Sequence, residues 1–200
     1  MKRLLNYMNL AIIITFFVYP LYSNVIYVSN VSELQNAVSN ILSGDTIFVE
    51  NGVYELTNTL VFDGGLHDVA IIGSSGYRDS VIIRGKGMNN SNYGNVPHII
   101  MIRDITNAYI ANLTLEDVYY HPIIIQAEQG AYAPHMNNLH IIDAGEQFVK
   151  VTSGGSTGPY CDYGILENSC LEYTDRARSW YTNGIDCLAV GFPSRCFFRP

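Results

Sequence analysis

Asn112-Leu-Thr-Leu, Asn138-Leu-His-Ile and Asn168-Ser-Cys-Leu can be superposed on one another and on Asp68-Val-Ala-Ile. The four copies begin 44, 26 and 30 residues apart, and 44 is about two turns of roughly 22 residues. In each copy a short amide or acid comes before an alternation whose first and third residues share one side of a strand. The residues that this alternation predicts to point inward are Val69/Ile71, Leu113/Leu115, Leu139/Ile141 and Ser169/Leu171.

A stack of coils explains these copies, because each strand then pairs with its counterpart one turn away and buries the same face. Asn112, Asn138 and Asn168 are expected at one corner of the stack, where asparagine tolerates the left-handed conformation and amides can form a ladder. A second set of alternations is expected to face the interior in the same way: Ile123/Ile125, Val149/Val151 and Ile185/Cys187.

The rest of the chain after Thr46 agrees with an all-β solenoid. Short β-type runs are broken by Gly, Asn and Asp, and hairpin turns of the Asn-Gly type are scarce between them, Asn51-Gly52 being the exception. No helical period recurs between the runs, which argues against a doubly wound α/β fold. A sandwich with tight hairpins stays open as an alternative.

One helix is predicted near the start of the chain. Ser32-Glu33-Leu34-Gln35 has the pattern of a capping box, in which the Ser32 oxygen accepts from free N–H groups and Gln35 reaches back. Apolar residues then follow at helical spacing, and Gly44 lies just past the expected end: Leu34, Ala37, Val38, Ile41 and Leu42. This apolar face needs a neighbour to cover it.

The length and net charge of the chain limit the domain count and the classes of partner. The 200 residues suit one domain, and the net charge of −7 argues against nucleic acid or an anionic membrane as the main partner. Lys2 and Arg3, followed by an apolar run over 10–22, predict a signal peptide at 1–23 and a β-helix domain at 24–200. A retained membrane anchor is the alternative. Export would place the mature protein outside the cell, in the periplasm or at the cell surface. We expect no membrane contact after the leader is removed, and a monomer when the protein is full length.

The four cysteines lie in the last 40 residues: Cys161, Cys170, Cys187 and Cys196. Export permits disulfides in three possible pairings, and buried free thiols are equally compatible with a large β core. Their spacing matches no zinc-binding pattern.

The opening of the chain resembles a known family. Ser-Glu-Leu-Gln-Asn-Ala (32–37), Gly-Asp-Thr-Ile-Phe-Val (44–49) and Asn-Gly-Val-Tyr (51–54) are similar to the start of pectate-lyase-like proteins, among them chondroitinase B and the alginate lyases. The resemblance covers about residues 25–190 and implies a right-handed parallel β-helix whose N-terminal helix plugs one end of the coil. It is specific for fold and weak for activity, because this fold hosts lyases, hydrolases, epimerases and non-catalytic adhesins.

The end of the chain departs from that pattern. After 183–186, further strand-turn copies would be expected, but Gly191-Phe-Pro-Ser-Arg-Cys-Phe-Phe-Arg-Pro contains neither such a copy nor a capping element. A solenoid needs a covered terminal turn. We therefore expect a β-helix that is incomplete and truncated at its C-terminus.

Candidate site residues lie on the outer face of the second column. The outward residues there are Ile124, Lys150 and Asp186, and Lys150 and Asp186 are expected to be neighbours across one turn. The family resemblance implies a polysaccharide lyase, which abstracts a proton α to a carboxylate and needs a base and positive charge or Ca²⁺. Lys150 is the candidate base, and Arg176 and Arg178 are candidate clamps for the carboxylate of an acidic glycan.

Further candidates come from the loop that follows. Trp180 and Tyr181 can stack on a sugar ring or pack within the loop. Four acids offer the hard oxygen ligands of Ca²⁺: Asp143, Glu172, Asp175 and Asp186. A plain exposed ion pair is the alternative for Lys150 and Asp186.

Two other kinds of site are weaker. His121, His135 and His140 follow no metal-ligand spacing, so surface or hydrogen-bonded histidines are expected. Glu116, Asp117, Asp143 and Glu172 could supply paired acids for glycoside hydrolysis, but the Ile142 turn separates Glu116 from Glu172. Three functions therefore stay open: a polysaccharide lyase, a non-catalytic glycan-binding surface protein, or an inactive fragment of either.

Overall fold

The computed structural model of the chain describes residues 23–155, 158–174, 184–187 and 197–199. The predicted leader at 1–23 lies outside the described residues except for Ser23. None of the helices in these ranges is long and apolar enough to cross a membrane.

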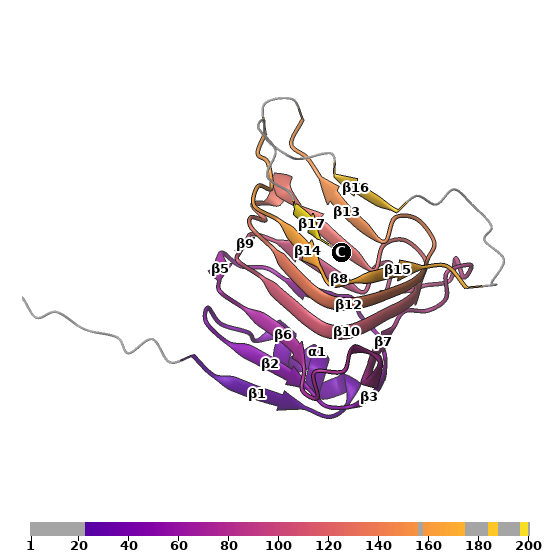
Figure 1. Ribbon diagram of the computed structural model, residues 1–200. Coiled ribbons are helices and arrows are strands. Elements are labelled where there is room, and N and C mark those ends of the chain that lie inside the picture. Colours follow the sequence, from indigo (N-terminus) through magenta and orange to yellow (C-terminus); the bar gives the residue numbers. More distant parts are fainter. Residues whose placement is uncertain (1–22, 156–157, 175–183, 188–196, 200) are drawn as a thin grey trace, which may run out of the picture.

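The described chain is mostly β-structure arranged in three sheets (Figure 1). Sheet A contains β1 (Val25–Val28), β2 (Thr46–Val49), β3 (Gly52–Glu55), β6 (Ala70–Gly73), β7 (Val81–Arg84), β10 (Tyr109–Val118), β12 (His135–Ala144), β14 (Ile165–Glu167), β15 (Cys170–Glu172) and β17 (Phe197–Arg199). Sheet B contains β4 (Leu60–Phe62), β8 (Ile100–Arg103), β11 (Ile123–Gln126), β13 (Val149–Thr152) and β16 (Ile185–Cys187). Sheet C pairs β5 (Leu66–His67) with β9 (Ile105–Thr106), and the helical segments are α1 (Val31–Ser39), η1 (Arg78–Ser80) and η2 (Ala127–Gln129).

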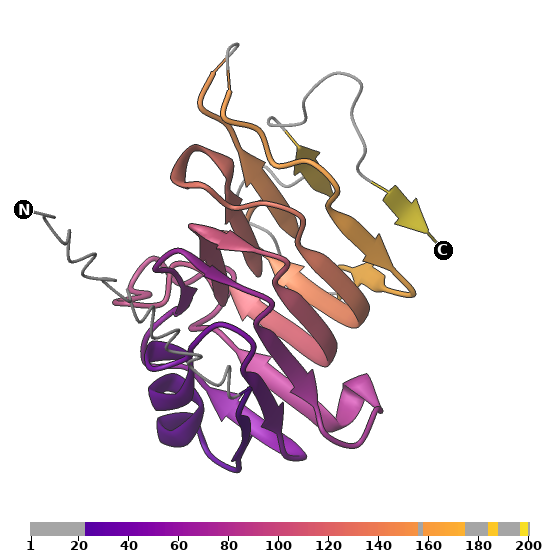
Figure 2. The same ribbon diagram turned by 90° about the vertical axis from the view of Figure 1, so that its left-hand side faces the viewer.

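The chain alternates between sheets A and B, and each visit adds a strand beside the previous one (Figures 1 and 2). From β10 onward, for example, β11, β12, β13, β14 and β16 fall in sheets B, A, B, A and B. All described strand pairs are parallel, which excludes a sandwich of tight hairpins for the described chain. Parallel stacking of successive turns, as predicted from the repeats, is confirmed.

The repeats align in register as predicted. Leu113 lies beside Leu139, and Ile141 lies between Leu115 and Leu171. In sheet B, Val149 lies between Ile123 and Ile185. Most of these side chains form one continuous buried core, and Leu171 and Ile185 pack against it while partly exposed. Like residues therefore stack over like, which is what buries a single apolar face along the whole described stack.

The repeat corners have the conformation that their short polar residues permit. Asn112, Asn138 and Asn168 have φ values of 59°, 52° and 53°, in the left-handed region. Asn138 Nδ2 donates to Asn112 Oδ1 at 2.9 Å, as the ladder prediction required. Asn168 Nδ2 instead donates to the side-chain oxygen Oδ1 of Asn137, at 2.8 Å, so the ladder shifts by one residue at its last step.

The helix is present, but its first turn differs from the prediction. Asn30 is the N-cap, and its Oδ1 accepts from the Glu33 N–H at 3.0 Å. Glu33 reaches back past the cap and accepts from the Ser29 N–H at 2.8 Å, so the cap predicted at Ser32 and Gln35 was placed two residues too late. The apolar face, including Leu34, is buried against β1, β2 and β4, which supply the neighbour that the sequence required.

The structure also corrects two further predictions, one about where the helix ends and one about the last residues of the chain. The helix ends at Ser39, so Leu42 lies beyond it and is 59% exposed. Near the other end, residues 197–199 form β17, which pairs in parallel with β14 and is one more strand of sheet A. The expectation that no further strand copy follows residue 186 was therefore wrong. Residues 188–196, which include Cys196, lie outside the described residues.

Candidate functional site on sheet B

Lys150 and Asp186 are neighbours on the outer face of sheet B, as predicted. They lie side by side on β13 and β16, and Lys150 Nζ donates to Asp186 Oδ2 at 2.5 Å. Their side chains are only 17% and 24% exposed, so this pair is more shielded from water than a typical surface ion pair. Ile124, the third residue of the predicted row, lies beside Lys150 but is itself buried.

His121, which the sequence predicts to be a surface or hydrogen-bonded histidine, is buried and lies close to this pair. His121 precedes β11, and its ring nitrogens lie 3.3 Å from the Gln147 carbonyl oxygen and 3.4 Å from Glu146 Oε2. Burial lowers the pKa of His121 to about 4, and the charge of Lys150 contributes in the same direction. The imidazole is therefore neutral at neutral pH.

His98 stacks on His121 and extends the same site. Their ring centroids are 5.1 Å apart with an angle of 10° between the planes. Burial is also the main reason that the pKa of His98 is lowered to about 4, and the neighbouring His121 adds to the effect. The two histidines are 23 residues apart in the chain, which is about one turn. Their proximity follows from the coil period, but that period had been derived for the strands alone.

Three tyrosines form an aromatic cluster next to His98. Tyr119 and Tyr120 follow β10, and Tyr93 belongs to the loop before β8. The ring centroids are 4.8 Å apart for Tyr93 and Tyr119 and 4.9 Å apart for Tyr119 and Tyr120, and His98 lies 5.7 Å from Tyr120. All three are partly exposed. Partly exposed aromatic rings with polar ends are suited to contact sugar rings.

The predicted calcium ligands do not meet among the described residues. Asp143 is fully buried, and its carboxylate accepts from the Thr174 N–H at 2.8 Å and the Thr174 hydroxyl at 2.7 Å. Glu172 lies in sheet A, whereas Asp186 lies in sheet B with Lys150. The fourth acid, Asp175, lies outside the described residues. As a joint ligand set, Asp143, Glu172 and Asp186 therefore do not form one site.

The alternative of paired acids for hydrolysis is weakened by a basic residue. Glu116 lies beside Arg84, which binds it and also contacts Glu55 at 2.7 Å. Ile142 lies between Glu116 and Glu172 in the row, as the sequence indicated. Glu116 is thus already paired with a cation. Four further predicted site residues lie outside the described residues and stay predictions: Arg176, Arg178, Trp180 and Tyr181.

Comparison with known proteins leaves the family undetermined. No protein-family profile matches the chain, and no curated protein matches it. One solved structure that is similar is that of an alginate lyase from Paenibacillus sp. str. FPU-7, with 14% sequence identity and a TM-score of 0.31. The match covers 74% of this chain and 66% of that chain, slightly less than two thirds of its length. A likeness at this level carries no argument about activity.

Proposed function

We propose that the chain is an exported, right-handed parallel β-helix protein of the pectate-lyase-like type that acts as a lyase on an acidic polysaccharide. The proposal rests on one observation: the shielded Lys150–Asp186 pair lies on an outer sheet face beside a neutral His121. The parallel, in-register stacking of turns supports the fold part of this proposal. Export rests on the predicted leader at 1–23.

Cleavage of a uronide by elimination requires two groups that this face can supply. The C–H bond α to the carboxylate breaks and its proton goes to a base; the C–O bond to the leaving sugar then breaks, and the leaving oxygen takes up a proton. The electron pair of the C–H bond becomes the new C=C bond, and a nearby cation stabilises the enolate on the way.

Lys150 is the proposed base. To act in this way its amine must first lose a proton to solvent, and the carboxylate of Asp186, 2.5 Å away, orients the amine on the outer face of the sheet. Neutral His121 is the second group nearby that can hold a proton. The tyrosine cluster of Tyr93, Tyr119 and Tyr120 would contact the sugar rings beside the cleaved bond. Arg176, Arg178 and Ca²⁺ remain the proposed sources of positive charge for the substrate carboxylate.

The test is a direct lyase assay on the full chain. Alginate, pectate and chondroitin are each incubated with the protein with and without Ca²⁺, and unsaturated products are followed by their ultraviolet absorbance. Lys150→Arg is the informative variant because arginine keeps the positive charge but does not release its proton. We expect Lys150→Arg to lower the rate by about 10²–10⁴-fold, the usual contribution of a general base, while glycan binding is retained.

A non-catalytic glycan-binding protein is the second candidate, because the Lys150 ammonium already has a carboxylate partner and the tyrosine cluster alone could bind sugar. It predicts glycan binding that survives Lys150→Ala and produces no new chain ends. Absence of unsaturated products from all three glycans, together with binding, would replace the lyase proposal with this one.

A further inference from the structure

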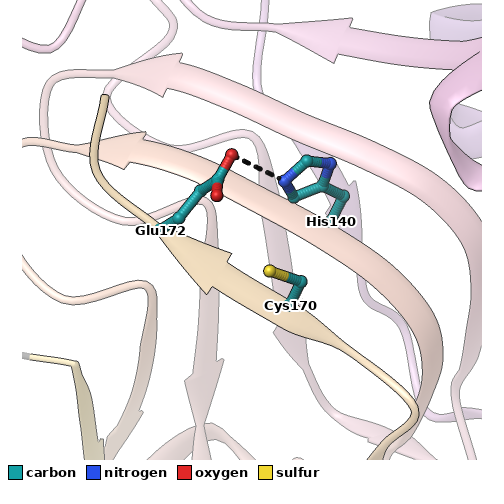
Figure 3. A group of neighbouring side chains, drawn as sticks. All are labelled: His140, Cys170 and Glu172. Carbon is teal, nitrogen blue, oxygen red and sulfur yellow. Dashed lines mark hydrogen bonds and ion pairs between the residues drawn. The ribbon is translucent and has the colours of Figure 1, made fainter. Parts of the chain in front are cut away.

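A second cluster of reactive side chains lies in sheet A and takes no part in the proposed lyase site. His140 on β12 lies directly beside Cys170 on β15, and Glu172 follows two residues later, beside Ile142. Since successive side chains of a strand alternate between faces, the three residues project from the same side of the sheet. Figure 3 shows their side chains gathered on that side. One ring nitrogen of His140, the Cys170 sulfur and one carboxylate oxygen of Glu172 all lie within 4.8 Å of one another.

The two nitrogens of the His140 ring face different partners. Nδ1 lies 2.9 Å from Asp79 Oδ1, and Nε2 lies 3.0 Å from Glu172 Oε1. Asp79 belongs to η1, and the Thr114 hydroxyl, 3.3 Å from the same oxygen, helps to orient it. With a cation bound, the Asp79 carboxylate would hold the ring proton at Nδ1 and leave the lone pair of Nε2, which faces Glu172, for the ion. Histidines that bind metal ions are usually held by such a carboxylate on the opposite nitrogen.

We propose that His140, Cys170 and Glu172 bind Zn²⁺, with Asp79 as the residue that orients His140. Imidazole nitrogen and thiolate sulfur are ligands that zinc prefers, whereas Ca²⁺ and Mg²⁺ are bound by oxygen. Three protein ligands leave the fourth tetrahedral position for water or an added ligand. The site lies in sheet A and does not depend on the proposed lyase activity at sheet B.

The ligand atoms need only a small movement to meet an ion. Zinc bonds of about 2.0–2.3 Å place tetrahedral ligands roughly 3.3–3.8 Å apart, so the widest separation must shrink by about 1 Å. His140 Nε2 and Glu172 Oε1 already lie 3.0 Å apart, so the movement falls to the partly exposed side chain of Cys170 and to Glu172, which is 49% exposed. Binding replaces the thiol proton of Cys170 and any proton on His140 Nε2, and both leave to solvent, so affinity should rise with pH.

The test uses Co²⁺ as a spectroscopic substitute for Zn²⁺ with the full, reduced chain. We expect one Co²⁺ per chain, a thiolate-to-cobalt charge-transfer band, and displacement of Co²⁺ by Zn²⁺. Cys170→Ser and His140→Gln should abolish the band, and Asp79→Asn should weaken binding by about 10–100-fold. The matched control is His135→Gln, because His135 also contacts a glutamate of the neighbouring strand, Glu167 at 2.8 Å, and belongs to no such cluster among the described residues. Circular dichroism verifies that each variant is folded.

A second measurement needs no substitution. Zn²⁺ should slow alkylation of Cys170 in the wild-type chain, mapped by mass spectrometry, and leave the rate at Cys187 unchanged. The proposal is overturned if Co²⁺ produces no thiolate band, if the band persists in Cys170→Ser, or if Zn²⁺ gives Cys170 no protection.

Discussion

Gly73 lies where the corner of the next turn crosses it. A Cβ atom at this position would be 2.0 Å from the carbonyl oxygen of Asn112, whose left-handed conformation forms that corner. Gly73→Ala must therefore move backbone, and we expect a loss in the free energy of unfolding of about 3 kcal/mol, at the upper end for overpacking. Gly52→Ala is the matched control, because its Cβ would meet only Tyr54 at an ordinary 3.6 Å. Urea denaturation of both variants would contradict this account if the two losses were equal.

The stacked pair His98 and His121 should make stability depend on pH in a defined window. Burial lowers both pKa values to about 4, from an ordinary value of 6.5. Between pH 4 and pH 6.5 the unfolded chain binds more protons at these two histidines than the folded chain does. Their contribution to the free energy of unfolding is therefore complete above about pH 6.5 and is lost as the pH falls toward 4. The melting temperature should drop by several degrees from pH 7 to pH 4.5, and less in the double variant His98→Asn/His121→Asn. Equal drops in both proteins would show that other groups are responsible.

At the scale of single elements, substitutions in the first turn of α1 can distinguish the observed cap, Asn30, from the predicted cap, Ser32. Asn30 accepts from the Glu33 N–H, whereas Ser32 lies inside the helix and is exposed. Asn30→Ala should therefore cost about 1 kcal/mol of stability, the usual value for losing a cap. Ser32→Ala should change stability by less than about 0.5 kcal/mol, as an exposed substitution does. Thermal unfolding measures the stability of the two variants. A larger loss of stability for Ser32→Ala than for Asn30→Ala would favour Ser32 as the cap.

The same element shows what sequence can specify and where it stops. The 3.6-residue spacing of apolar residues located the helix, because burying one face leaves a pattern in the chain. Its first residue was misplaced, since Asn30 and Ser32 both carry oxygens that can cap a helix, and in the structure Asn30 is the cap. Strand alternation likewise placed Lys150 beside Asp186. The repeat alignment also sets His140 beside Cys170, but it does not reach Asp79, which comes from an earlier turn and contacts His140 only once the turns have stacked.

At the scale of the whole molecule, stability should be graded along the stack. Each turn of a solenoid contacts only its neighbours, so the effect of a substitution depends on how many neighbours its strand has. Strand β12 lies between β10 on one side and β14 and β15 on the other, whereas β15 pairs with β12 alone among the described strands. Leu139 on β12 is fully buried and Leu171 on β15 only partly.

Leu139→Ala should therefore destabilise the protein far more than Leu171→Ala, although both residues hold inward positions of the repeat. For Leu139 the expected loss is about 2–5 kcal/mol, because a fully enclosed leucine leaves a cavity that its neighbours cannot fill. For Leu171 it is about 1 kcal/mol, because the lost apolar contact is smaller and water reaches the site. Hydrogen exchange gives an independent measurement: in Leu139→Ala, amides of both β10 and β15 should exchange faster, while in Leu171→Ala the increase should be confined to β15 and adjoining β12. Equal losses for the two variants, or faster exchange of β1 and β2 in either, would contradict nearest-neighbour stacking as the source of stability.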